Sequence, residues 1–184
     1  MFWQKFLPGK YLAWPDMDII ALKDGGYGFV STYADTPGWP NVPTDIYYGK
    51  LDEGGDTVWT RTFSRFPYSQ GRQQGRQITE AENGDLIITG TSTWYGVYNI
   101  LLRTNAVGQV KWYREYRYID TPPGNYDFEQ EVAAMSYTPR KQILLSGKFS
   151  SNQKRPAFDT VGTFSWFVLT DTFGCIEPGC QDAD

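Results

Sequence analysis

The hydrophobic residues of this chain occur in short runs that are bounded by Gly, Asp, Asn and Pro. One recurring pattern is a turn sequence followed by an apolar run, and it begins at Asp24, Asn83 and Arg140, spaced 59 and 57 residues apart. Short runs rich in Val, Ile, Leu, Tyr and Phe between turn residues are typical of β-strands rather than helices. The pattern therefore predicts β-strands that repeat along the chain.

Two further patterns recur in the same order as the first. In one, an apolar run leads into a D/N-x-x-G turn that ends at Gly55, Gly108 and Gly174. In the other, a tryptophan is followed two positions later by a basic residue, and the copies are Trp3-Gln-Lys5, Trp59-Thr-Arg61 and Trp112-Tyr-Arg114. Three patterns that keep their order through successive cycles indicate an internal repeat.

A fourth, looser run precedes the first turn of each cycle, so each unit is expected to contain four short strands. A unit of this size with four strands corresponds to one blade of a β-propeller. We expect an all-β fold, a β-propeller-like array of about three four-stranded antiparallel blades. The expected units are residues 8–63, 70–116 and 127–174, with a strand at 2–6 completing a blade and 175–184 forming a C-terminal tail.

The two ends of the chain are complementary in this repeat. The chain starts with a lone tryptophan strand at Trp3 and ends, after Gly174, where the next such strand is expected. Because propellers have about four to eight blades, three blades do not readily close into a ring. Two arrangements follow. Either the chain is the C-terminal part of a longer propeller, or copies join head to tail, with the strand at Trp3 completing the last sheet of a partner.

Composition excludes several classes of function. The 184 residues carry 17 Lys and Arg against 21 Asp and Glu, a net charge of −4, so no basic surface is expected to attract nucleic acid. The absence of histidine excludes His-ligated zinc and the Ser-His-Asp and Cys-His catalytic arrangements. No apolar run approaches the roughly 20 residues that a membrane-spanning helix needs. We therefore expect no nucleic-acid partner and no membrane span.

The two cysteines, Cys175 and Cys180, are close together in the sequence. No other Cys and no His is present to complete a metal site, so a local disulfide is expected, with two free thiols as the alternative. A disulfide implies an oxidising compartment, and we expect a secreted or cell-surface location. A bridge this local would fix the tail rather than the core.

Carboxylates recur at the turns, at Asp24, Asp52, Asp56, Asp85 and Asp171. Asp at such positions commonly accepts hydrogen bonds from backbone N–H groups of its own turn, and we interpret these residues as structural. The alternatives are a carboxylate pair for glycoside hydrolysis and a calcium site, although the spacing does not match a calcium-binding loop. We assign no catalytic residue, no metal ligand and no cofactor.

The aromatic residues divide into two groups. Trp59 and Trp112 are expected to seal the space between blades, with an Arg two positions later lying along a ring. The second group lies in expected loops, where rings stack on sugars or anchor protein partners, with packing of the loop on its own blade as the alternative. These candidate ligand-binding residues are Trp39, Trp94, Tyr95 and Tyr126. The polar run 71–77 is interpreted as a solvated connection, with anion binding as the alternative.

At the aligned residues the chain resembles a family of secreted β-propeller-type repeat proteins of Bacteroidota. The segments Asp24-Gly-Gly-Tyr27 and Lys50-Leu-Asp-Glu-Gly-Gly-Asp-Thr-Val-Trp59 carry the resemblance most closely, and it covers nearly the whole chain. The ending at 171–180 is similar to the close of the last blade in such proteins, ahead of a type IX secretion sorting domain that is absent here. The resemblance implies a surface or released protein with no shared catalytic residue.

From these observations we expect a non-enzymatic extracellular module for binding or adhesion, with a glycan or a surface protein as its partner. The first alternative is a carboxylate-dependent glycoside hydrolase or lyase. The second is a structural component of the cell envelope. Hydrolysis that is lost on replacing one Asp, while binding persists, would distinguish the hydrolase from the binding module.

Overall fold

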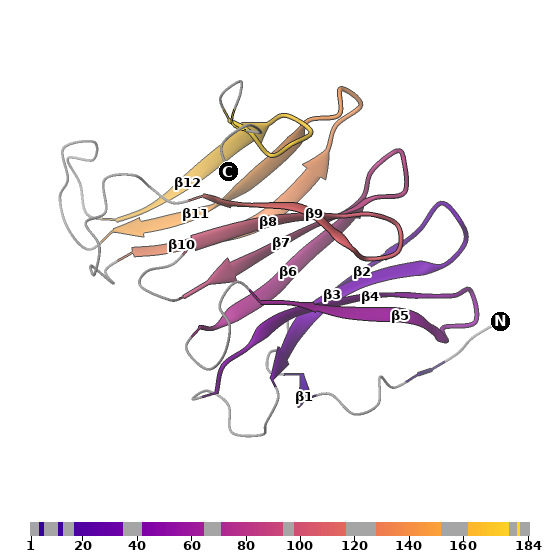
Figure 1. Cartoon of the computed structure of the whole chain (residues 1–184). Coiled ribbons are helices and arrows are strands. Elements are labelled where there is room, and N and C mark those ends of the chain that lie inside the picture. Colours follow the sequence, from indigo (N-terminus) through magenta and orange to yellow (C-terminus); the bar gives the residue numbers. More distant parts are fainter. Residues whose placement is uncertain are drawn as a thin grey trace.

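The computed structural model describes residues 4–5, 11–12, 17–34, 42–64, 71–93, 98–116, 128–151, 162–176 and 180, and the following statements concern these residues. They form β-strands and turns without an α-helix, in three antiparallel sheets (Figure 1). The prediction of an all-β fold is therefore confirmed. None of the described segments is an apolar helix of membrane-spanning length.

The first sheet has four strands and one two-residue strand. They are β1 (Tyr11–Leu12), β2 (Asp18–Ala21), β3 (Tyr27–Ala34), β4 (Asp45–Leu51) and β5 (Thr57–Phe63). Both β1 and β2 pair with β3 on the side opposite β4, so together they take the place of a single interrupted strand. The sheet thus has the meander order that the repeat predicts.

The second and third sheets repeat this order. The second consists of β6 (Gln73–Glu80), β7 (Leu86–Ser92), β8 (Tyr98–Thr104) and β9 (Val110–Tyr116). The third consists of β10 (Phe128–Tyr137), β11 (Ile143–Ser151) and β12 (Gly162–Thr170). Within the described residues, no strand pairs with the free edge of β12. The third sheet therefore has three described strands, in agreement with the absence of a tryptophan strand after Gly174, and the three sheets do not close into a ring.

The sheets stack face to face in sequence order, with the second between the other two (Figure 1). Alternate residues of a strand point to opposite faces, so β7 supplies Ile88 to the core shared with the first sheet and Ile87 to the core shared with the third. Both side chains are completely buried. Each such side chain stabilises the fold by roughly 1.5 to 3 kcal/mol relative to exposure. The second sheet thus holds the array together.

Two tight turns recur in every sheet and explain the repeated sequence patterns. The turn that follows β2, β6 or β10 contains a residue with positive φ, which is Gly25, Gly84 or Lys141 respectively. In the D/N-x-x-G turn, a side-chain oxygen of Asp52, Asn105 or Asp171 accepts the N–H four residues later, at 2.8 to 2.9 Å. The structural interpretation of Asp52 and Asp171 is therefore confirmed.

Lys141 is the only described non-glycine residue with positive φ, at 62°, and it occupies the place of Gly25 and Gly84. This conformation costs an L-residue roughly 1 to 2 kcal/mol, part of which glycine returns through its larger unfolded-state entropy. We expect Lys141→Gly to raise the free energy of unfolding by about 0.5 to 1 kcal/mol in urea denaturation. Lys141→Ala is the control, because it removes the exposed Lys141–Glu82 ion pair but keeps the strain. An equal gain from both variants would contradict this explanation.

One sequence interpretation needs correction. The run 71–77 is not a solvated connection, because β6 begins at Gln73 and its first three residues are buried. Backbone groups of this segment find partners in and beside the first sheet. Gly75 N–H donates to Thr32 Oγ1 of β3, and Thr44 Oγ1, directly before β4, donates to Gln73 O. Of the strand expected at 2–6, the structure describes only Gln4 and Lys5, which lie outside the three sheets of the single chain. A strand requires a partner for its backbone, and none is described beside them.

Candidate functional site

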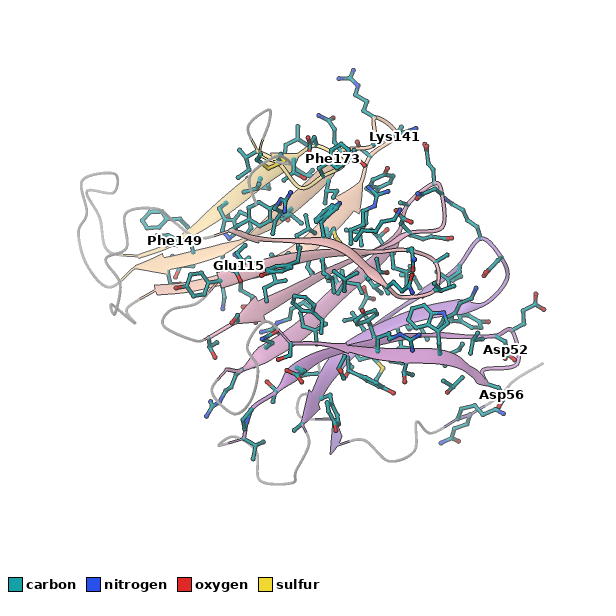
Figure 2. The ribbon with its side chains drawn as sticks, viewed as in Figure 1. Asp52, Asp56, Glu115, Lys141, Phe149 and Phe173 are labelled. Carbon is teal, nitrogen blue, oxygen red and sulfur yellow. A yellow bond between two sulfur atoms is a disulfide. The ribbon has the colours of Figure 1, made fainter. Side chains whose placement is uncertain are left out.

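One end of the sheet array carries the tight turns, and the opposite end carries the other connections between strands. The tight turns lie at one end, where Lys23 Nζ donates to Ala81 O of the next sheet at 2.9 Å and Lys141 pairs with Glu82 at 3.4 Å. Figure 2 shows Asp52, Asp56 and Lys141 at this end and Phe149 towards the other. The connections that leave the opposite strand ends are residues 35–41, 65–70, 94–97, 117–127 and 152–161. We call this opposite end the loop end.

The four predicted ligand-binding residues belong to the loop-end connections. Trp39, Trp94, Tyr95 and Tyr126 all lie outside the described residues, so the structure gives no position for their side chains. It does show that the flanking strands start or finish at the same end of the array, since β3, β5, β7, β9 and β11 all run towards it. The strand topology therefore directs the attachment points of these segments to a common end.

Trp59 and Trp112 are used for packing between sheets. A Cβ atom on Gly108 would lie 2.5 Å from the Trp59 ring, and one on Gly174 would lie 3.0 Å from the Trp112 ring. Each tryptophan of an outer strand thus covers the D/N-x-x-G turn of the next sheet. Arg61 and Arg114 lie 5.8 Å from the centres of the respective rings. These positions agree with the sealing role that the sequence predicts.

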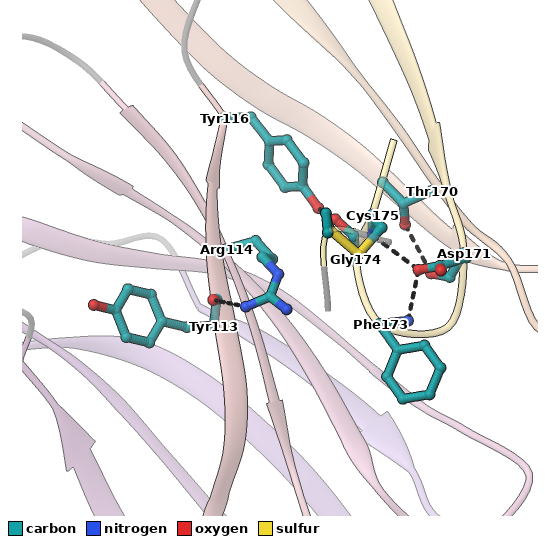
Figure 3. Close-up of a disulfide and its surroundings, with 9 residues drawn as sticks. Tyr113, Arg114, Tyr116, Thr170, Asp171, Phe173, Gly174 and Cys175 are labelled. Atoms are coloured by element: carbon teal, nitrogen blue, oxygen red, sulfur yellow. Dashed lines mark hydrogen bonds between the residues drawn. A yellow bond between two sulfur atoms is a disulfide. The ribbon is translucent and has the colours of Figure 1, made fainter. Parts of the chain in front are cut away.

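A tyrosine accompanies each tryptophan at these junctions. The Tyr48 hydroxyl donates to Gly108 O at 3.0 Å, and the Tyr116 hydroxyl donates to Gly174 O at 2.6 Å. Burial raises the pKa of Tyr48 to about 12 and also raises that of Tyr116, so both hydroxyls remain protonated donors at neutral pH. Figure 3 shows Tyr116 of β9 directed towards the turn of the third sheet.

The disulfide expected from the sequence is present in the same region. Cys175 and Cys180 are bonded, with their Cα atoms 5.5 Å apart. Cys175 N–H also donates to Asp171 Oδ1 at 2.8 Å, so the bridge follows directly on the last D-x-x-G turn (Figure 3). The bond therefore ties the tail to the turn that β9 covers.

Asp85 has a role that sequence analysis missed. Its carboxylate accepts from Arg103 Nε at 2.8 Å and from Lys111 Nζ at 2.8 and 3.0 Å, and Asp85 is 4% exposed. Arg103 also donates to the backbone oxygen and hydroxyl of Thr172, at 2.8 and 2.6 Å. Asp85 therefore joins strands of the second sheet through its ion pairs and holds Arg103, which hydrogen-bonds to the turn of the third sheet, instead of capping its own turn. A signal was available, because a buried strand rarely contains an Arg without a partner.

The same contacts decide the charge of Asp85. Burial alone would raise the pKa of this carboxyl, but hydrogen bonds from Lys111, Asn83 and Arg103 together outweigh it and hold the pKa below its usual value. A carboxylate that is ionised and held by two cations is poorly suited to act as a general acid or as a nucleophile. We therefore assign Asp85 to structure and not to catalysis.

A hollow of about 430 Å³ lies at the tight-turn end of the first sheet. Its lining residues are Asp24, Gly26, Lys50, Asp52, Glu53, Gly54 and Val58. The hydrogen bond from Lys50 to Asp24 lowers the pKa of that carboxyl, and Asp52 is bound to its own turn. Across the described ranges, no group of three or more Asp, Glu, His or Cys residues is arranged to hold a metal ion. The hollow therefore provides neither a catalytic pair nor a metal site that we can assign.

Comparison with protein-family models and with curated proteins finds no match to this chain.

Proposed function

We propose that this chain is a non-enzymatic binding or adhesion module of a β-propeller-like type, which acts outside the cell and binds a glycan or a surface protein through its loop end. The observation that carries the proposal is the shared direction of the loop-end connections. Every connection that contains one of the four candidate aromatic residues departs from that one end of the described strands. Aromatic rings grouped in this way are suited to stacking on sugar faces or anchoring a protein partner.

The contacts at the opposite end and between the sheets support a binding role over a catalytic one. The carboxylates described there are engaged with cations or with their own turns, as Asp24 is with Lys50, Asp52 with its turn and Asp85 with Arg103. The tryptophans of the outer strands are engaged in packing between sheets. The loop end therefore remains the surface on which we place the ligand.

The disulfide supports the location in this proposal. Disulfides persist in oxidising environments such as the cell exterior and the bacterial periplasm, and are rare in the cytosol. The bond between Cys175 and Cys180 agrees with the secreted repeat proteins that the chain resembles. A type IX secretion substrate of Bacteroidota is the specific form of the proposal.

Binding should depend on the aromatic residues of the loop end. We expect the full chain to bind particular oligosaccharides on a glycan array or a surface protein, and Trp39→Ala or Trp94→Ala to weaken that binding about tenfold. Tyr95→Ala and Tyr126→Ala should have smaller effects in the same direction. Phe173→Ala is the matched control, because this ring is 46% exposed on a tight turn at the other end, and binding should be unchanged. Calorimetric titration with the best oligosaccharide or protein measures the affinities.

Two results would contradict the proposal. If Phe173→Ala weakened binding as much as Trp39→Ala and Trp94→Ala did, the loop end would not be the binding surface. If the same oligosaccharides were cleaved, and a single Asp→Asn change abolished cleavage while binding persisted, the chain would be a glycoside hydrolase or lyase. Mass spectrometry of the incubated oligosaccharides detects such cleavage.

A further inference from the structure

Among the described strands, the third sheet has no counterpart of the outer strand that the other two sheets have. In the first sheet β5 pairs with β4, and in the second β9 pairs with β8, whereas no described strand pairs with the outer edge of β12. Such an edge presents a row of backbone N–H and C=O groups to any strand that can reach it. Figure 1 shows β12 at the outside of the array, beyond β11. The edge is therefore available for strand addition.

The outer face of the third sheet is apolar and open. Phe167 is 72% exposed, Leu169 49% and Leu144 37%, and the pairing of Leu144 with Leu169 places these residues on one face. In the second sheet, the residue four positions before the D/N-x-x-G turn is Leu101, which corresponds to Phe167 and is fully buried by the third sheet. The repeat therefore has a surface that is covered in the second sheet and uncovered in the third.

Lys5 lies beside the D-x-x-G turn of the first sheet, as an outer strand of a preceding sheet would. Lys5 Nζ contacts Asp56 Oδ1 at 2.7 Å, which brings Lys5 to the D-x-x-G turn of the first sheet. In the second sheet Arg114, two residues after Trp112, contacts the corresponding turn of the third sheet at Gly174. Lys5 follows Trp3 at the same spacing. The segment thus has the sequence and the turn contact of an outer strand, while Gln4 and Lys5 belong to no sheet.

We propose that residues 2–6 of a second copy add to β12 as the fourth strand of the third sheet. The pairings of Lys50 with Trp59 and of Leu101 with Arg114 set the register, which places Trp3 opposite Leu169 and Lys5 opposite Phe167. The donated segment keeps the contact with its own Asp56, as β9 keeps its contact with the turn of the next sheet. The first sheet of one copy then follows the third sheet of the other.

A second copy is the occupant that the repeat itself specifies. In the described part of the chain, β12 has an edge without a strand partner, and the sequence carries at Trp3 a segment with the tryptophan pattern of β5 and β9. In a pair of copies, the N-terminal segment of each chain can therefore pair with the β12 edge of the other and complete its third sheet. This head-to-tail pairing closes on itself in a symmetric dimer.

Oligomeric state provides the first test. Light scattering after size exclusion should give a dimer, twice the 21.0 kDa of one chain. Trp3→Ala and Leu169→Lys should each raise the dimer dissociation constant at least tenfold. Val107→Lys is the matched control, because Val107 is 54% exposed on a turn of the second sheet and its replacement should leave the dimer unchanged. A monomer at high protein concentration, or a dimer indifferent to both Trp3→Ala and Leu169→Lys, would overturn the proposal.

Cross-linking provides a second test that does not depend on dimer strength. Opposed residues on neighbouring strands have Cβ atoms about 4.5 to 5.5 Å apart, within reach of a disulfide after small shifts. A Lys5→Cys chain mixed with a Phe167→Cys chain should form a covalent heterodimer on mild oxidation. A Lys5→Cys chain mixed with a Val107→Cys chain should not. Equal cross-linking in the two mixtures would overturn the proposed register and pairing.

Discussion

Replacement of Asp85 by alanine should lower the free energy of unfolding by about 3 to 5 kcal/mol, because it leaves the buried Arg103 guanidinium without its carboxylate. Arg103 would retain its hydrogen bonds to Thr172, but its charge would lie uncompensated between two sheets. The loss would also free Lys111, which is half-exposed and can turn to solvent at little cost. Urea denaturation followed by tryptophan fluorescence at pH 7 measures the change.

Glu82→Ala is the control for this prediction. Glu82 pairs with Lys141 at 3.4 Å on the surface, so its removal should cost well under 1 kcal/mol. Adding Arg103→Met to Asp85→Ala should recover part of the lost stability, because the second change removes the unpaired buried charge. A cost below 1 kcal/mol for Asp85→Ala alone would show that the pairing of Asp85 with Arg103 contributes little to stability.

The Asp85 carboxylate should also make the free energy of unfolding fall at acid pH. The pKa of Asp85 is lower in the folded chain than in the unfolded chain, where it is about 3.9. Its stabilising contribution is therefore complete above about pH 4 and is lost as the pH falls through the folded value. Stability of the Asp85→Asn variant should fall less steeply over this acid range than that of the unaltered chain.

The second large effect is expected at the junctions between sheets. Gly108 has φ of 79°, and a Cβ atom there would lie 2.5 Å from the Trp59 ring. Gly108→Ala should therefore combine the cost of positive φ with displacement of the ring, for a total of about 3 kcal/mol. Gly174→Ala should behave similarly at Trp112, where the approach is 3.0 Å. Thermal and urea denaturation report the losses.

Gly84→Ala separates the two costs. Its φ of 80° equals that of Gly108 within a degree, but the nearest atom to an added Cβ is 3.7 Å away, which is an ordinary contact. This variant should lose only about 1 kcal/mol, from the backbone conformation alone. If Gly84→Ala and Gly108→Ala cost the same, the packing of Trp59 on the turn would contribute nothing to stability.

Much of the fold could be predicted from the sequence, because strands and tight turns are encoded within a few residues. The Asp-x-x-Gly pattern specifies a turn in which the Asp side chain accepts a backbone N–H and Gly takes positive φ, as seen at Asp171 and Gly174. The link between Cys175 and Cys180 was predictable for the same reason, since the two residues are near neighbours. The order of strands in each sheet followed from the repeat.

The local sequence pattern did not predict burial where that burial depends on residues distant in the sequence. The polar start of β6 gave the appearance of a loop, yet Gln73 and Gln74 are buried. Backbone groups of this segment bond to Thr32 of β3 and to Thr44 directly before β4, and those hydrogen bonds replace the ones to water that burial removes. No hydrophobic pattern within the segment itself indicates this environment.

The sequence by itself determined the all-β class, the positions of most strands and turns, and the local disulfide. The tertiary structure alone decided that Asp52 serves its own turn whereas Asp85 pairs with Arg103 and Lys111 on other strands of the second sheet. These partners are 18 and 26 residues from Asp85 and meet it through sheet pairing. It also decided that Leu101 is buried against the third sheet whereas the corresponding Phe167 is exposed. Backbone preferences act over a few residues, but the burial and charge of a side chain depend on what the fold places against it.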